Sequence, residues 1–174
     1  MKILAFLFFG LFLFTLTGSD AFAQYRKLTV ILLRHAEKDL TEPDAPNPEL
    51  TAAGKQRAEK LVSVVNKYQP DAIYSSDYIR TRETVRPLAR KNRAMTLIYD
   101  PRNLGQMRDL ILSGKYKRVV VVGHNNTTPA LVNMLIDREK YEKLPETEYG
   151  KIWVVKIRKN EKKPNKTTDR VIEY

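Results

Sequence analysis

The chain has 174 residues, of which 43% are hydrophobic, and its formal net charge is +11. This length and hydrophobic fraction are typical of one globular domain, and they exclude a globally disordered chain. With no cysteine and only two histidines, disulfides and thiolate metal sites are excluded, and we expect neither a metal site nor a cofactor.

The first 23 residues have the layout of a secretory signal peptide. Lys2 precedes an apolar run over residues 3–16, and Ala21-Phe22-Ala23 fits a small-x-small cleavage site. The run is shorter than the roughly 20 residues that a spanning helix needs, so an uncleaved membrane anchor is the weaker alternative. We therefore expect a secreted or periplasmic domain of residues 24–174, without stable membrane insertion after cleavage.

The excess of basic residues favours partners that carry negative charge, such as nucleic acid, anionic membranes or phosphorylated substrates. Many lysines gather in RKNEKKPNK (158–166), which we interpret as a solvated turn. No aromatic residues alternate with these lysines, as a stacking platform for single strands would require. We therefore expect a small phosphorylated substrate and no nucleic-acid partner.

Strands and helices alternate along the rest of the chain. LTVILL (28–33) and RVVVV (118–122) are almost entirely apolar, as in strands that are buried on both faces of a parallel sheet. Shorter strands are predicted over residues 71–75 and 96–99. A last strand, over residues 151–158, is expected nearer a sheet edge and paired with residues 170–174.

Four helices are predicted between these strands from apolar positions spaced by three and four. The first follows residues 50–54 and ends at Pro70, and the second covers residues 77–91, where Pro87 implies a kink or a late start. The third is closed by Gly114, and the fourth is capped by Thr127 or Thr128. The order predicts an α/β, three-layer sandwich with a largely parallel sheet.

Both histidines follow a predicted buried strand. His35 comes after residues 28–33 and Arg34, and His124 comes after residues 118–122 and Gly123. A single histidine in this position is an ordinary surface or capping residue, but two of two at matching strand ends indicate a site. In parallel sheets, ligands bind outside the carboxyl ends of the strands.

Two arginines are expected at the same edge. Arg34 directly precedes His35, and Arg80 lies in the first turn of the helix that follows the strand over residues 71–75. Guanidinium groups bind phosphate oxygens in a bidentate way, and a neutral imidazole can attack phosphorus to form a phosphohistidine. The four side chains therefore predict phosphoryl chemistry.

Four segments, in order, resemble the histidine phosphatase superfamily of phosphoglycerate-mutase-like enzymes. RHAEK (34–38) resembles its Arg-His-Gly/Ala signature, and LTAAGKQRAEKL (50–61) its Leu-Thr-x-x-Gly segment. YSSDYIRTRETVRPLA (74–89) resembles its second-arginine segment, and VVVVGHNNTTPALV (119–132) its second-histidine segment. The likeness is greatest to short, single-domain members, including bacterial phosphohistidine phosphatases.

The resemblance implies a role for each of the four residues. His35 would be the nucleophile, Arg34 and Arg80 would clamp the phosphoryl oxygens, and His124 would complete the pocket and stabilise the transition state. It also implies that no metal is needed, because the arginines neutralise the charge. The glutamate that protonates the leaving group in larger members has no counterpart here. Glu37 and Asp100 are the two candidate proton donors, although a salt bridge and a turn are the simpler interpretations of these two residues.

Three functions remain in competition. The first is an exported phosphatase that hydrolyses phosphomonoesters or similar compounds through a phosphohistidine on His35. The second is a non-catalytic module that binds phosphate or phosphosugars, and the third is a phosphohistidine protein phosphatase, which fits export poorly because such relays are cytoplasmic. A phosphoglycerate mutase is disfavoured by the short chain and the export signal. The acidic loop over residues 39–49 is expected to rim the pocket.

Overall fold

A computed structural model describes residues 27–42, 44–160 and 162–174. The predicted signal peptide over residues 1–23 lies outside these residues. Among the residues that the structure describes, no helix is long and apolar enough to cross a membrane. The elements, in chain order, are β1 (Lys27–Arg34), α1 (Ala52–Val65), a 3-10 turn (Asn66–Tyr68), β2 (Ala72–Ser76), α2 (Ile79–Asn92), β3 (Thr96–Tyr99), α3 (Leu104–Ser113), β4 (Arg118–Gly123), α4 (Thr127–Ile136), β5 (Lys151–Arg158) and β6 (Lys166–Glu173).

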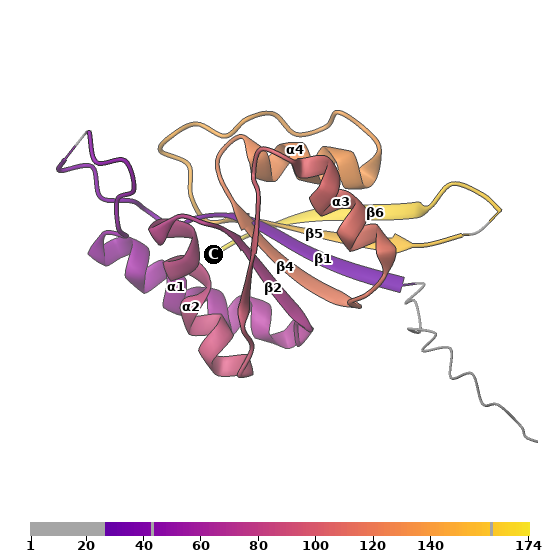
Figure 1. The fold of residues 1–174 in the computed structure, drawn as a ribbon, viewed down its shortest axis with the longest axis horizontal. Coiled ribbons are helices and arrows are strands. Elements are labelled where there is room, and N and C mark those ends of the chain that lie inside the picture. The colour runs from indigo at the N-terminus through magenta and orange to yellow at the C-terminus, as the bar shows by residue number, and fades with distance from the viewer. Residues whose placement is uncertain (1–26, 43, 161) are drawn as a thin grey trace, which may run out of the picture.

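The strands form one six-stranded sheet in the order β3-β2-β4-β1-β5-β6. The first four strands of this order are parallel, and β5 and β6 add to β1 as antiparallel strands. The predicted three-layer α/β sandwich is confirmed, because α1 and α2 cover one face of the sheet while α3 and α4 cover the other (Figure 1). The pairing of the last two strands is also as predicted.

The apolar runs of β1 and β4 serve both layers because alternate side chains point to opposite faces. Leu28, Val30 and Leu32 belong to the core under α3 and α4, whereas Ile31 and Leu33 belong to the core under α1 and α2. All five are 2% exposed or less. Burial on both faces explains why these strands lack the alternation of polar and apolar residues.

The register brings the carboxyl ends of β1, β2 and β4 to one edge of the sheet. Arg34 of β1 is paired with Gly123 of β4, and Ser75 of β2 is paired with Val122. Since the three strands are parallel, the residues that follow them leave the sheet on the same side. This edge is where the sequence places both histidines.

Three local predictions need correction. The cap of α4 is Asn126, whose side chain accepts a hydrogen bond from the Thr127 backbone, and not Thr127 or Thr128. Helix α2 starts at Ile79 and runs through Pro87 to Asn92, so the proline does not delay its start. Helix α1 ends at Val65, and a 3-10 turn separates it from Pro70.

Candidate active site

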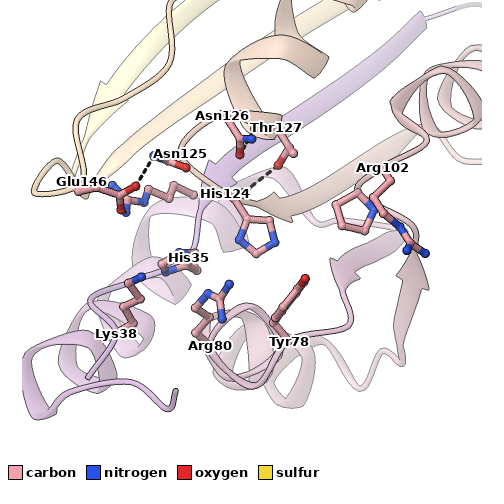
Figure 2. A pocket seen from close by; sticks show the side chains of 12 residues that line it. His35, Lys38, Tyr78, Arg80, Arg102, His124, Asn125, Asn126, Thr127 and Glu146 are labelled. Carbon is pink, nitrogen blue, oxygen red and sulfur yellow. Dashed lines mark hydrogen bonds and ion pairs between the residues drawn. The ribbon is translucent and has the colours of Figure 1, made fainter. Parts of the chain in front are cut away.

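A cavity of about 490 Å³ opens at the carboxyl edge of the parallel strands (Figure 2). Its lining contains all four residues that the sequence predicts to converge, Arg34, His35, Arg80 and His124. The remaining lining residues are Lys38, Tyr78, Pro101, Arg102, Asn125, Asn126, Thr127 and Glu146. The pocket is thus rich in cations and hydrogen-bond donors, and Glu146 is the carboxylate in its described lining.

The end of β1 fixes the backbone around His35. The His35 backbone N–H donates to the Gly123 carbonyl of β4 at 3.0 Å, and the next N–H, of Ala36, donates to the Thr84 hydroxyl at 2.9 Å. That hydroxyl in turn donates to the Arg80 carbonyl at 2.7 Å. Strand β1 and helix α2 are therefore coupled directly beside the histidine.

Helix α1 also packs closely against this segment. A Cβ atom on Gly54 would lie 2.3 Å from the Glu37 carbonyl oxygen, so only glycine allows the helix to approach. This contact explains the glycine in the LTAAG stretch. It also means that the His35 segment is held from β4, α1 and α2 at once.

The hydrogen bonding of His35 defines its tautomer. Its Nδ1 lies 2.7 Å from the Ala36 carbonyl oxygen, which can only accept, so Nδ1 carries a hydrogen. Burial, with the nearby Arg34 and Arg80 charges, lowers the pKa of His35 to about 3. At neutral pH the ring is therefore uncharged, and Nε2 keeps its lone pair.

His124 lies on the opposite side of the pocket and, like His35, is uncharged at neutral pH. The two imidazole centroids are 5.5 Å apart, and the Nε2 of His124 is 2.9 Å from the Ser76 hydroxyl at the end of β2. Burial and the charges of Arg80, Arg34 and Lys38 lower its pKa to about 4. A bound anion would raise this pKa and favour protonation of the ring, so the charge of His124 responds to the ligand.

Gly123 permits the turn that delivers His124. A Cβ atom there would come within 2.8 Å of the Thr127 hydroxyl and of the Tyr99 hydroxyl. The Thr127 hydroxyl accepts the His124 backbone N–H at 3.0 Å. The Thr127 hydroxyl thus occupies the space that a side chain on Gly123 would need, and it holds the His124 backbone.

Arg34 is held from outside the sheet by the segment of residues 138–150. Its Nη1 donates to the carbonyls of Pro145 and Glu148 at 2.8 and 2.9 Å, and its Nη2 donates to the Glu146 carboxylate at 2.9 Å. The guanidinium also lies 4.3 Å from the centre of the Tyr149 ring. Its side chain is only 2% exposed.

The two arginines each keep one buried donor unused. Among the described residues, three buried side-chain nitrogens lack a hydrogen-bond partner, and two of these are the Nε atoms of Arg34 and Arg80. The Arg80 guanidinium lies 4.3 Å from the centre of the Tyr78 ring, and burial lowers its pKa. Buried donors without acceptors are costly, and an oxyanion between these arginines would satisfy both.

The two predicted proton donors do not reach the pocket lining. Both Glu37 oxygens accept from Arg57, at 2.6 to 2.9 Å. Burial raises the pKa of Glu37, but the hydrogen bonds and charge of Arg57 outweigh burial and leave this pKa below its usual value. Asp100 is exposed and hydrogen-bonded to Arg102, which holds the Asp100 pKa low. Both carboxylates therefore stay ionised and engaged elsewhere.

The described residues of the acidic loop, 39–42 and 44–49, do not line the pocket, contrary to expectation. Its Asn47 side chain instead accepts the Ile79 backbone N–H at the start of α2, at 2.9 Å. The carboxylate at the pocket comes from Glu146, in a segment without regular structure. Sequence reasoning missed Glu146 and Tyr149, because LPETEYGK (144–151) has no periodicity or motif that points to a site.

The arrangement suits an incoming phosphoryl group. It combines an uncharged imidazole lone pair, two guanidinium groups with free Nε donors, and a second uncharged imidazole. Within residues 27–42, 44–160 and 162–174, no group of three or more His, Asp or Glu residues is arranged to hold a metal ion.

Solved structures with the same fold are known. A putative phosphohistidine phosphatase SixA from Agrobacterium tumefaciens shares 24% identity at a TM-score of 0.59, over 74% of this chain and 90% of that one. A mycobacterial glucosyl-3-phosphoglycerate phosphatase shares 16% identity at a TM-score of 0.62, over 76% and 91%. The protein histidine phosphatase SixA complexed with tungstate shares 13% identity at a TM-score of 0.62, over 84% and 97%. These similarities bear on the fold alone.

The sequence itself matches a family model. No curated protein sequence matches the chain significantly, but residues 30–103 match the model of the histidine phosphatase superfamily (branch 1). That range includes Arg34, His35 and Arg80, and the pocket adds His124 from outside it. Over residues 30–103 the chain is therefore similar to the histidine phosphatase superfamily (branch 1).

Proposed function

We propose that this protein is an exported phosphatase that hydrolyses phosphomonoesters or similar phosphorylated compounds through a phosphohistidine on His35. One observation carries the proposal. The uncharged His35, with its hydrogen on Nδ1, lies in one pocket with two arginines whose buried Nε donors lack acceptors. A phosphoryl group supplies both the electrophile for Nε2 and the acceptors for the arginines.

The reaction has two steps. Nε2 of His35 attacks phosphorus while the bond from phosphorus to the leaving oxygen breaks, and the leaving group departs with that electron pair. Arg34, Arg80 and His124 stabilise the charge on the transferring oxygens. A water molecule then attacks the phosphohistidine, the P–N bond breaks, and inorganic phosphate leaves. The Nδ1–H bond to Ala36 keeps the ring orientation throughout.

A poor leaving group must receive a proton as it departs, whereas a good leaving group does not need one. Glu37 is bound by Arg57, outside the pocket lining, and Asp100 is bound by Arg102, which lines the pocket while Asp100 does not. Because neither of the two predicted proton donors lines the pocket, substrates that need little acid assistance are favoured, such as aryl phosphates, acyl phosphates and phosphohistidine. A phosphohistidine protein phosphatase is therefore the second candidate, and the fold similarity to SixA structures is consistent with it.

Turnover of an aryl phosphate tests the proposal. The wild-type chain should release phosphate, and His35→Ala should lose this activity while it keeps the wild-type thermal unfolding profile. Equal turnover of the two proteins would contradict catalysis through His35. Saturable binding of phosphate or vanadate without turnover would instead support the non-catalytic binding module.

A further inference from the structure

A second cavity, of about 410 Å³, lies at the opposite end of the sheet from the active-site pocket. Strand β1 runs from Lys27, which lines this cavity, to Arg34, which lines the pocket. Five cations contribute to the lining, and no carboxylate of the described chain does. We call this cavity the basic groove, and its cations are Lys27, Lys117, Lys156, Arg158 and Lys166.

Like charges face one another directly across the strands of the basic groove. Lys27 of β1 is paired with Arg158 of β5, and Arg158 is paired with Lys166 of β6. Like charges directly opposite each other destabilise a sheet. None of the five cations has a side-chain hydrogen bond or ion pair with any described residue, so no carboxylate of the described chain offsets this repulsion.

The helices leave this part of the sheet uncovered. On the face that carries α1 and α2, β5 is buried at Ile152 and Val154 but exposed at Lys156 and Arg158. The β5–β6 hairpin extends from the same end of the sheet (Figure 1). Its sequence over residues 158–166 carries five basic residues and one acidic residue. The result is an exposed, strongly cationic face away from the active site.

We propose that the basic groove docks on the headgroups of an anionic phospholipid bilayer. Neighbouring strands lie about 4.8 Å apart, so the row of cations matches a planar array of singly charged headgroups better than one compact anion. Basic residues close to an anionic membrane surface each add to the attraction. Among the described residues, no aromatic side chain lines the groove, which disfavours the base stacking that single-stranded nucleic acid requires.

The position of Lys27, the first described residue, supports the same occupant. The apolar run over residues 3–16 ends shortly before Lys27, which is itself part of the basic groove. The described chain therefore begins at the cationic end of the sheet, at Lys27. Docking through the basic groove points the active-site pocket, at the other end of β1, away from the bilayer. The pocket would then face substrates that are in solution or that project from the membrane.

A site-specific probe can test this contact because the chain has no cysteine. Thr168→Cys, in the groove lining, would carry a fluorophore in the full-length chain, and Thr41→Cys, exposed in the loop before α1, would carry it as the control site. We expect quenching by headgroup-spin-labelled lipid at position 168, with phosphatidylglycerol vesicles and not with phosphatidylcholine vesicles. Position 41 should stay unquenched in both. Quenching at position 168 that is equal on the two lipids overturns the proposal.

Two variants that each lose three lysines distinguish an effect of the basic groove from an effect of net charge. Lys117→Gln/Lys156→Gln/Lys166→Gln should abolish the quenching at position 168, whereas Lys60→Gln/Lys91→Gln/Lys143→Gln, on exposed sites elsewhere, should retain it. Loss in both variants, or in neither, contradicts a groove-specific contact. If the groove variant does not fold, two other tests replace it. Lys156→Gln alone must weaken the quenching at position 168. The same quenching must also weaken in about 1 M salt, where the Debye length is about 3 Å. A stronger preference for a duplex oligonucleotide than for anionic vesicles would also overturn the lipid assignment.

Discussion

The Glu146 carboxylate joins Arg34 to the loop that carries the second histidine. Its Oε2 accepts from the Arg34 Nη2 at 2.9 Å, and its Oε1 accepts from the Asn125 Nδ2 at 2.7 Å. Asn125 directly follows His124. One carboxylate therefore both offsets the charge of the buried arginine and links the two histidine-bearing strand ends.

Glu146→Gln should tighten the binding of phosphate or vanadate about threefold to tenfold. The reason is that it removes a negative charge close to the anion site, where a pair of charges at about 4 Å contributes on the order of 1 kcal/mol in a solvated environment. Inhibition constants measured at fixed pH and salt report the change. Glu148→Gln is the matched control, because the Glu148 side chain pairs with Lys151 outside the pocket lining. Weaker binding by Glu146→Gln would mean that the carboxylate orients Arg34 more than it offsets its charge.

Glu37→Gln should lower stability without affecting the chemistry. The Arg57 guanidinium that holds Glu37 also donates to the Tyr174 carbonyl at 2.7 Å, so the pair ties the His35 segment and α1 to the end of the chain. We expect the free energy of unfolding to fall by about 1 to 2 kcal/mol, as for a half-buried charge-assisted hydrogen bond. Denaturant unfolding measures this loss, and Glu59→Gln, from an exposed pair with Arg90, should change it little. A fall in kcat that grows with the pKa of the leaving group would instead revive Glu37 as the proton donor.

Both histidines should stay uncharged well below the ordinary histidine pKa of about 6.5. Their pKa values are lowered to about 3 for His35 and about 4 for His124 by burial and nearby cations. Since the unfolded chain binds protons near pH 6.5 and the folded chain does not, stability should fall as the pH drops from about 6.5 toward 4. Proton NMR of the two imidazole Cε1–H signals tests this directly, with His124→Gln to assign them. A midpoint near 6.5 for either signal would contradict the buried, uncharged state.

Lys38 should favour substrates that carry a second anionic group. It lines the pocket and has no side-chain hydrogen bond or ion pair within the described chain. We expect Lys38→Gln to lower the ratio of kcat/KM for 3-carboxyphenyl phosphate over phenyl phosphate by about threefold to tenfold, on the order of 1 kcal/mol for one solvated charge pair. Lys55→Gln, which alters a pair with Glu49 outside the pocket lining, should leave this ratio unchanged. An equal loss on both substrates would assign Lys38 to the phosphoryl group itself.

The sequence predicts the strand ends well because local apolar runs determine them. β1 and β4 are buried on both faces, and two such strands in a parallel sheet must end at the same edge. That rule was sufficient to bring His35, His124, Arg34 and Arg80 to one pocket. Topology therefore brings these four residues to one edge of the sheet, and local contacts orient their side chains.

Long-range contacts of irregular segments are what the sequence does not reveal. Glu146 reaches Arg34 across a separation of 112 residues, from a segment with no secondary structure. Glu37 resembles a site residue in the sequence, but Arg57 binds it 20 residues further along, and nothing in the local pattern indicates this pairing. The sequence therefore places the two arginines and the two histidines in the pocket, but it does not place the carboxylates correctly.

Detection of the phosphoenzyme tests the central claim most directly. The full-length protein would be mixed with an aryl phosphate and quenched in alkali, where phosphohistidine survives, and the peptide that contains His35 would be analysed by mass spectrometry. The account predicts one phosphoryl group on His35, which is lost on acid treatment and is absent from His35→Ala. An active enzyme without phosphate on His35, or with phosphate on His124 instead, would contradict it.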